Sequence, residues 1–407
     1  MDVLRFRSAV SPLRRGFDPV PSLLPCVDDL VRVARPEEPM HCLRPGTLAA
    51  TARGFVAAFP GDVLYAVKCN PEPAVLRALW AGGVRHFDCA SANEVALVRS
   101  MFPDAEIHFM HPVKPRGAIR EAWARHGVRD FVLDSAAELA KLQQEIAATG
   151  VAGDLGLIVR LALPKGQAVL DLSGKFGAPA EEAVALLRAA RPLAARLGVS
   201  FHVGSQCLDP LAWRRALALV GEVIRDADVA IDIVDAGGGF PVEYPEVVPP
   251  PLGAFIAEIE DGFDRLDLPN ARLWAEPGRA LVAGGGSVVV QVQLRRGEAL
   301  YLNDGVYGSL ADAGTLGFRY PTRMIRGSDA PPRAFRFYGP TCDSADVMEG
   351  PFLLPADIAE GDWIEIGQLG AYGGCLRTGF NGFDRARIVE VRDGPVAAEP
   401  AALAAVA

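Results

Sequence analysis

The sequence predicts an α/β protein: a closed (β/α)8 barrel, the TIM-barrel architecture, followed by a β-rich C-terminal domain. Between residues 60 and 280, short apolar strand candidates alternate with alanine-rich helical segments. Strands this apolar are buried on both faces, as in a parallel sheet that helices cover. Eight strand–helix units in one run favour a closed barrel over an open doubly wound sheet. After about residue 280, valine- and aromatic-rich strands separated by Gly/Pro turns replace the helical repeats.

Eight segments are expected to form the barrel strands. They are VLYAVK (63–68), RHFDCA (85–90), EIHFMHP (106–112), DFVLD (130–134), LGLIVRL (155–161), SFHVGS (200–205), IDIVDAGG (231–238) and RLWAEPG (272–278). Between them, helical segments such as AEEAVALLRAARPLAARLG (180–198) repeat apolar residues at three- and four-residue spacing. We therefore expect a barrel domain at 45–280, a β-barrel or sandwich domain from 1–44 plus 281–395, and a disordered tail at 396–407.

Composition narrows the function classes. The chain has 407 residues, of which 50% are hydrophobic and 22% charged, with 41 Lys and Arg against 50 Asp and Glu. A globular protein is expected, and a nucleic-acid partner is not. The most apolar stretch, 280–294, is shorter than the roughly 18–20 residues that span a bilayer, so no membrane partner is expected. Seven cysteines without C-x-x-C spacing favour a cytoplasmic protein over a disulfide scaffold or a zinc site.

Polar residues stand at the ends of the predicted barrel strands. They are Lys68, Asp88, His111, Asp134, Arg160, His202, the glycines 237–239 and Glu276. The C-terminal strand ends of such a barrel converge at one face, so these residues are expected to meet in one pocket. The alternative for any single one of them is a solvated turn residue. His111, Asp134 and Cys89 are interpreted as structural.

Two of these strand ends suggest a specific chemistry. Lys68 lies inside an apolar strand, where it is either a lysine that reaches out to solvent or a Schiff-base lysine whose lowered pKa leaves a nucleophilic amine. The run DAGGGFP (235–241) is either a plain turn or a set of backbone amides that close on an anion such as phosphate. Arg279, in the following EPGR, is positioned to add a guanidinium.

The β-rich region carries three further loops of interest. GPTCDSAD (339–346) places Cys342 beside Asp343 in a Gly-Pro turn, where an exposed thiol and proton donor is favoured over a small buried hydrophobe. YLNDGVYGSL (301–310) and QLGAYGGC (368–375) each combine a tyrosine with glycines. The segment 164–177 is interpreted as a surface loop or as a mobile lid.

Taken together, these motifs resemble a known family. YAVKCNP, FDCAS, FHVGSQ, DAGGGFP, EPGR, NDGVYGS, GPTCDS and FNGF occur in this order between about residues 45 and 385. They resemble the ornithine/lysine decarboxylases of the alanine-racemase-like fold (fold type III), which depend on pyridoxal 5'-phosphate. The resemblance implies a homodimer with shared active sites that releases CO2 and a diamine from ornithine, lysine or a related amino acid in polyamine metabolism.

The resemblance also implies roles for individual residues. Lys68 would hold the cofactor through a Schiff base, Glu276 would pair with the pyridine nitrogen, and His202 would stack on the ring. The phosphate would be held by Ser205, Gly238, Gly239, Gly278, Arg279 and Tyr372. The aldimine side of the site would be lined by Asp88, Glu94 and Arg160. Cys342, from the other subunit, would reprotonate the α-carbon, and the substrate's distal amine would meet Asp343, Tyr307 and Asp312.

One departure leaves the substrate open. C-D-S at 342–344 favours a diamine-producing enzyme over the diaminopimelate decarboxylases, which usually carry C-E-S. A second acid expected after NDGVYGS falls on Leu316, and Asp312 is the candidate to replace it. The alternatives are the same chemistry on diaminopimelate or a carboxylated polyamine, a non-catalytic decarboxylase-like binding protein, and a racemase of this fold. Retention of the lysine, the glycines and the cysteine disfavours the non-catalytic alternative, and GPTCDS disfavours the racemase.

Overall fold

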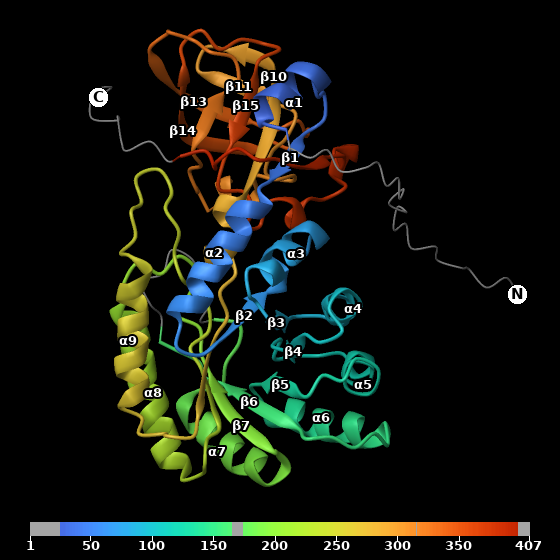
Figure 1. Ribbon diagram of the computed structural model, residues 1–407, viewed down its shortest axis with the longest axis vertical. Coiled ribbons are helices and arrows are strands. Elements are labelled where there is room, and N and C mark those ends of the chain that lie inside the picture. The colour runs from blue at the N-terminus through green and yellow to red at the C-terminus, as the bar shows by residue number, and fades with distance from the viewer. Residues whose placement is uncertain (1–24, 165–173, 315, 398–407) are drawn as a thin grey trace, which may run out of the picture.

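The computed structural model describes residues 25–164, 174–314 and 316–397. The predicted tail from residue 398, the N-terminal residues 1–24 and most of the predicted loop at 164–177 lie outside this part of the chain. In Figure 1 the β-rich part lies above the barrel, and α2 (Pro45–Ala58) runs from the β-rich part down along the barrel.

The predicted barrel is present and closed. Eight parallel strands pair in the order β2-β3-β4-β5-β6-β7-β8-β9, and β9 pairs with β2. Their bounds are β2 (Asp62–Ala66), β3 (His86–Cys89), β4 (Glu106–Phe109), β5 (Asp130–Leu133), β6 (Gly156–Arg160), β7 (Arg196–Ser200), β8 (Ile233–Asp235) and β9 (Arg272–Ala275). Every second side chain of a strand points into the barrel. The inner cluster consists of Leu64, Met110, Val132, Ile158, Ile233 and Trp274.

Helices cover the barrel from outside. They are α3 (Pro73–Ala81), α4 (Ala92–Met101), α5 (Arg116–Ala124), α6 (Ala136–Ala148), α7 (Ala180–Ala190), α8 (Leu211–Ala227) and α9 (Leu252–Asp264), followed by the short α10 (Arg279–Val282). Their apolar faces join the outer faces of the strands in the largest core cluster. This arrangement explains the apolar run of each strand, since both of its faces are buried.

One predicted strand was misplaced. The strand expected at 200–205 is β7 at Arg196–Ser200, and the helix expected over 180–198 ends at Ala190. Pro192 cannot continue the helical hydrogen bonds, so the chain passes through a short 3-10 turn (Arg191–Leu193) and begins the strand with buried Leu197 and Val199. Residues 201–204 are therefore a loop beyond the strand end.

The β-rich part is a mixed sheet that also includes β1, a strand from the N-terminal side of the barrel. Its main strand order is β12-β15-β10-β11-β13-β14, and β1 joins β10 to β16. The bounds are β1 (Met40–Leu43), β10 (Gly286–Arg296), β11 (Ala299–Leu302), β12 (Thr322–Met324), β13 (Pro332–Tyr338), β14 (Val347–Pro355), β15 (Trp363–Ile366) and β16 (Arg387–Glu390). Helix α1 (Val27–Ala34) packs beside β1 (Figure 1). The exact domain boundaries at residues 45 and 280 stay predictions.

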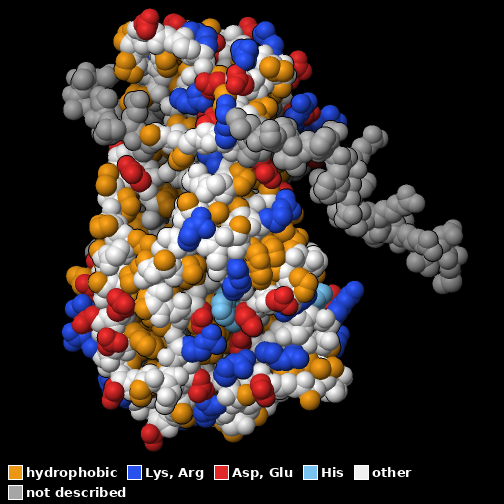
Figure 2. All heavy atoms as spheres, in the orientation of Figure 1, with side chains coloured by type: hydrophobic (Ala, Val, Ile, Leu, Met, Phe, Trp, Pro, Cys, Tyr) orange, Lys and Arg blue, Asp and Glu red, His pale blue; other side chains and the backbone are white. Residues whose placement is uncertain are grey.

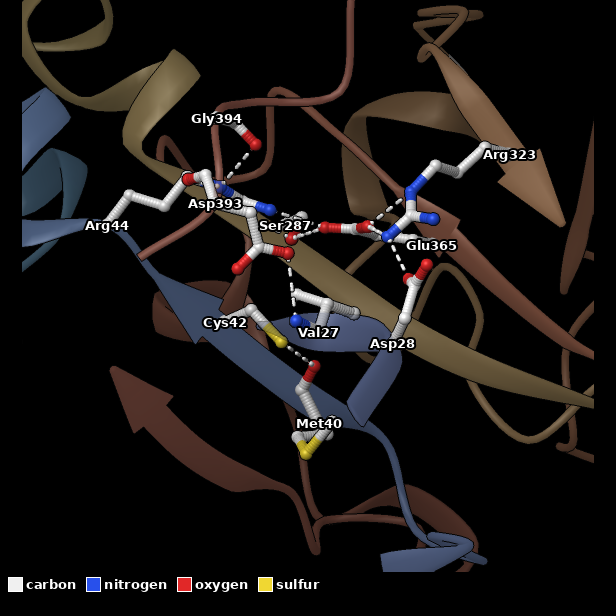
Figure 3. Close-up of polar contacts among 10 residues, drawn as sticks. All are labelled: Val27, Asp28, Met40, Cys42, Arg44, Ser287, Arg323, Glu365, Asp393 and Gly394. Carbon is white, nitrogen blue, oxygen red and sulfur yellow. Dashed lines mark hydrogen bonds and ion pairs between the residues drawn. The ribbon is translucent and has the colours of Figure 1, made fainter. Parts of the chain in front are cut away.

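A buried polar network ties the junction together (Figure 3). Arg44, which links β1 to α2, donates to Glu365 on β15 at 2.6 Å and to Ser287 on β10 at 2.9 Å. It also donates to the carbonyls of Asp393 and Gly394. Glu365 also pairs with Arg323 at 2.6 Å. Because Arg44 is buried and Glu365 is the carboxylate it pairs with, removing Glu365 would leave a buried charge unpaired, which typically costs about 3–5 kcal/mol.

None of the described helices combines the length and apolar character needed to cross a bilayer. On the face shown in Figure 2, acidic and basic side chains are interspersed over both the barrel and the β-rich part.

Candidate active site

A cavity of about 410 Å³ opens at the C-terminal ends of the barrel strands, where barrels of this kind build their active sites. Most of the predicted cofactor residues line it: Lys68, Arg160, His202, Ser205, Gly239, Glu276, Gly278, Arg279 and Tyr372. The two others lie directly behind the lining, because Asp88 accepts a hydrogen bond from Lys68 and Gly238 precedes Gly239. Tyr372 belongs to a loop of the β-rich part, so both parts enclose the cavity.

Lys68 lies in a 3-10 turn, η1 (Val67–Cys69), directly after β2. Its Nζ donates to Asp88 Oδ2 at 2.7 Å, and 48% of its side chain is exposed. Burial lowers the pKa of Lys68, but the negative charges of Asp88 and Glu276 outweigh burial and raise the pKa above its ordinary value. The predicted lowered pKa is wrong for this state of the chain, because the prediction took no account of the acid on the next strand. The ammonium must lose its proton before the nitrogen can act as a nucleophile.

The glycine run forms a tight turn after β8. Gly237 and Gly239 have φ values of +67° and +106°, which side chains rarely adopt. A Cβ on Gly238 would lie 2.6 Å from the Glu276 carbonyl oxygen and 3.1 Å from His202 Nε2. The amides of Gly238 and Gly239 donate to no other described residue. The turn can therefore present two N–H groups to an anion.

Arg279 is held at the same end of the cavity. It is buried, and its guanidinium donates to the Tyr244 hydroxyl at 2.8 Å and to Asp312 Oδ2 at 2.9 Å. Its Nε has no acceptor among the described residues. Sequence reasoning missed Tyr244, whose loop carries no motif that would have marked it. The geometry also argues against the predicted substrate contact of Asp312, because that carboxylate is already paired with Arg279.

His202 and Glu276 face the cavity from neighbouring loops. The Nδ1 atom of His202 accepts from the Gly204 N–H at 3.0 Å. Burial, and then the positive charges of Arg160 and Lys68, lower the pKa of His202 to about 3, so the imidazole is neutral near pH 7. Burial and nearby carboxylates raise the pKa of Glu276 well above its ordinary value. The cavity thus offers a neutral ring and a carboxyl group that gains a proton readily.

Of the remaining residues singled out in the sequence, some line the cavity and others do not. Glu94 accepts from the Ala90 N–H at 2.7 Å and Asp134 from the Gly177 N–H at 3.0 Å, and neither lines the cavity. His111 does line it, and its ring meets Phe176 edge-on with centroids 5.1 Å apart. Sequence reasoning missed Phe176. Its place in the 164–177 segment, two residues after Gly174, was the available signal.

A second cluster lies on the β-rich part. Cys342 and Asp343 line a separate depression of about 560 Å³, which shares no residue with the cavity around Lys68. The Tyr307 hydroxyl donates to Asp343 Oδ2, and Asn381 Oδ1 accepts from the Cys342 N–H at 2.9 Å. Cys342 is exposed. The structure therefore brings Cys342, Asp343 and Tyr307 together, but away from Lys68 of the same chain.

The residues around the cavity fit pyridoxal phosphate. The cofactor needs an amine for its aldehyde, an acceptor beside its pyridine nitrogen and donors around its phosphate. Lys68 supplies the amine and Glu276 the carboxyl group. The unpaired Arg279 Nε and the two free glycine amides supply donors at one end. The turn leaves no room for a Cβ at Gly238, which is what close approach of an anion to the backbone requires.

Comparison with known proteins supports the same class. Residues 46–283 match the model of the pyridoxal-dependent decarboxylase family's pyridoxal binding domain. A lysine/ornithine decarboxylase from Selenomonas ruminantium is 33% identical over 342 residues, which cover 82% of this chain and 84% of that protein. The crystal structure of lysine/ornithine decarboxylase from Vibrio vulnificus, complexed with putrescine, matches with a TM-score of 0.77 and 33% identity, covering 90% of this chain and 97% of the other.

These matches, together with the cavity, assign the chain to the pyridoxal-dependent decarboxylase family. The chain is a decarboxylase that uses pyridoxal phosphate. Similarity of this degree extends beyond proteins named as decarboxylases: antizyme inhibitor 2 of Xenopus laevis is 30% identical over 368 residues, which cover 82% of this chain and 76% of that protein. The side chains around the cavity are therefore as important to the assignment as the fold.

Proposed function

We propose that the chain decarboxylates a basic amino acid, ornithine, lysine or a close relative, and releases CO2 and a diamine. The observation that carries this proposal is the gathering of Lys68, Glu276, His202 and the glycine turn around one cavity. The names of the relatives support the substrate class, since the similar proteins are a lysine/ornithine decarboxylase and one complexed with putrescine. A cytoplasmic location goes with this proposal.

Each residue at the barrel mouth has a distinct task. Bound pyridoxal phosphate supplies an electron sink for the pair left when CO2 departs. Lys68 would anchor the aldehyde, and Asp88 holds the lysine nitrogen in place at 2.7 Å. The carboxyl group of Glu276 would bind the pyridine nitrogen, and neutral His202 would contact the ring without adding charge. Arg279 and the glycine amides would bind the phosphate.

We propose further that the active enzyme is a homodimer. The proton donor Cys342 and the acid Asp343 are absent from the lining of the cavity that contains Lys68. A two-fold dimer places the same surface of each chain against its partner, so each Cys342 cluster can complete the partner's cavity. Cys342 then delivers a proton to the α-carbon, and Asp343 receives the distal ammonium group of the substrate.

Asp343 is the favoured recognition residue for that ammonium group. Tyr307 donates to Asp343, which fixes the carboxylate, and hydrogen bonds from the Ala345 N–H and Tyr307 lower the pKa of Asp343. Leu316, at the position expected for a second acid, is 45% exposed, and Asp312 is paired with Arg279. With one acid instead of two to bind the distal ammonium group, the site is expected to accept substrates whose side chains differ in length.

Mixing two inactive variants tests the shared site. In a mixed dimer, the cavity of the Lys68→Ala chain lacks the anchor and is completed by the chain that carries Cys342→Ala. Both defects therefore fall in one cavity, and the other cavity keeps both Lys68 and Cys342. Each variant alone is expected to be inactive, and co-refolded mixtures should recover about one quarter of wild-type CO2 release, because half of the dimers are mixed and each has one intact site. The same assay, run with wild type on ornithine, lysine, arginine and diaminopimelate, identifies the substrate. Absence of recovery in a mixture shown to be dimeric would contradict the shared site.

A further inference from the structure

Asp235 is a buried carboxyl group for which neither the motif analysis nor the proposed reaction has a use. In β8 it follows Ile233 by two residues, and directly after the end of β9 Glu276 follows Trp274 by two. The Glu276 N–H donates to the Gly237 carbonyl oxygen at 2.8 Å, which continues the pairing beyond the strand. Ile233 and Trp274 both belong to the inner cluster of the barrel. Because side chains alternate along a strand, Asp235 and Glu276 both point inward. Asp235 pairs in register with Trp274, so Glu276 stands one layer above it, at the cavity floor.

The two oxygens of Asp235 have different surroundings. Oδ1 accepts from the Gly237 N–H at 2.9 Å, which fixes the start of the glycine turn. Oδ2 is buried and accepts from no donor in the described chain. The Asp235 side chain is fully buried and lies within hydrogen-bonding reach of the Glu276 carboxyl group. Two carboxylates cannot donate to each other, so a proton on one of them is what would satisfy the orphaned oxygen.

The surrounding charges favour that proton. The other titratable or charged groups that act on the pair are Lys68, Asp88, His108 and Arg160. Asp88 adds a third carboxyl group, and its pairing with Lys68 engages the ammonium group nearest to the pair. Burial, and then Asp88, raise the pKa of Asp235 to about 6, although hydrogen bonds with the Gly237 N–H and with Glu276 oppose this rise. Burial, and then Asp235 and Asp88, raise the pKa of Glu276 well above its ordinary value. Two close buried carboxyl groups cannot both ionise at little cost.

We propose that Asp235 and Glu276 hold one proton between them, and that Asp235 is the positioning residue that orients Glu276 and sets its charge toward the cofactor cavity. In the empty cavity the proton lies between the two carboxyl groups. When a protonated ring nitrogen faces Glu276, Asp235 keeps the proton and donates it as a hydrogen bond, so that Glu276 stays ionised. No proton leaves the pair in this exchange of position. Asp235 therefore acts on two parts of the cavity. It fixes the glycine turn through the Gly237 N–H, and it orients the Glu276 carboxyl group.

The test uses the full-length apoprotein, so it does not depend on the proposed substrate or on the dimer. Infrared difference spectra near pH 5 would follow the stretching band of a protonated buried carboxyl group in wild type, Asp235→Asn and Glu276→Gln. We expect the band in wild type and its loss in both variants, since an amide in either place donates the hydrogen bond and leaves the other group ionised. Asp130→Asn is the matched control, because Asp130 is a buried acid whose pKa is lowered to about 2, and it should leave the band unchanged.

Loss of the band in only one of the two variants would overturn the proposal, because the proton would then belong to a single residue. Absence of the band from wild type would overturn it as well. Cofactor binding gives the second readout. Asp235→Asn keeps both hydrogen bonds and should bind pyridoxal phosphate within about threefold of wild type, whereas Asp235→Ala should bind it about tenfold or more weakly. Equal weakening in the two variants would show that Asp235 acts only through its negative charge, contrary to the proposal.

Discussion

The cavity at the barrel mouth and the Cys342 cluster of the β-rich part carry similar side chains under opposite conditions. In the barrel, Asp88 and Arg279 are buried and paired within one chain. In the Cys342 cluster, Cys342 is exposed and Asp343 is held by a single tyrosine and a backbone amide. The barrel residues stand on strand ends, whereas the cluster stands on loops. One chain therefore prearranges the cofactor half of the site, whereas the proposed proton-donor half would acquire a low dielectric in the proposed dimer, when another surface covers it.

Removing the anchor should have the largest effect. Lys68→Ala is expected to lower turnover by about 10³-fold or more, because the covalent attachment point is lost. The absorbance band of the bound aldehyde should disappear at the same time. Lys141→Ala, on α6 and outside the cavity lining, is the control and should keep both. A Lys68→Ala protein that retains the band would show that another amine holds the cofactor. The barrel cavity would then not be the cofactor half of the site.

Removing the proton donor should affect only the second half of the site. Cys342→Ala is expected to lower kcat about 10²- to 10³-fold, within the usual range for a general acid, while the affinity for pyridoxal phosphate stays unchanged. Cys26→Ala changes a thiol that lines neither cavity and serves as the control. Weaker cofactor binding in Cys342→Ala would mean that the two halves are not separable in the way the single chain indicates.

Features that depend on nearby residues could be predicted from the sequence, whereas features that depend on contacts between distant segments could not. The barrel strands follow from local apolar runs, and Lys68 and Glu276 follow from their place at strand ends. The position of β7 was missed because the alanine-rich periodicity continues past Pro192. The raised pKa of Lys68 and the pairing of Asp312 with Arg279 depend on contacts between distant segments. No pattern within a few residues encodes such contacts.

Adding a methyl group to the glycine turn should have a smaller effect, which is confined to cofactor affinity. A methyl group at Gly238 would approach the Glu276 carbonyl oxygen to 2.6 Å, so Gly238→Ala should weaken pyridoxal phosphate binding by about 10- to 100-fold, which corresponds to about 1.4–3 kcal/mol. Gly54→Ala is the matched control, since a Cβ there meets nothing within 4 Å in α2; it should stabilise the protein by about 0.5–1 kcal/mol. Titration of the apoprotein with cofactor measures the first effect, and urea unfolding the second. Equal affinity in Gly238→Ala and wild type would place the phosphate elsewhere.

The opposite end of the barrel provides the smallest expected effect on turnover. Asp130, at the start of β5, accepts from His108 at 3.1 Å and from Arg196 at 2.7 Å. Burial opposes its ionisation, but these hydrogen bonds outweigh burial and lower the pKa of Asp130 to about 2. A carboxyl group whose pKa is lowered by folding stabilises the protein above its unfolded pKa, near 4, and this stability is lost as the pH falls toward 2.

Asp130→Asn should therefore reduce the free energy of unfolding at pH 7 by about 2 kcal/mol and leave kcat and cofactor affinity as in wild type. Urea unfolding at pH 7 and pH 3 measures this, and the difference between variant and wild type should shrink at the lower pH. Asp104→Asn, at an exposed turn, should show no such difference at either pH. Asp130, His108 and Arg196 lie at the end of the barrel away from the cavity. A change in cofactor affinity in Asp130→Asn would therefore mean that the charge at this end affects Asp235 and Glu276 across the inner cluster of the barrel. The pair would then be tuned from both ends of the barrel.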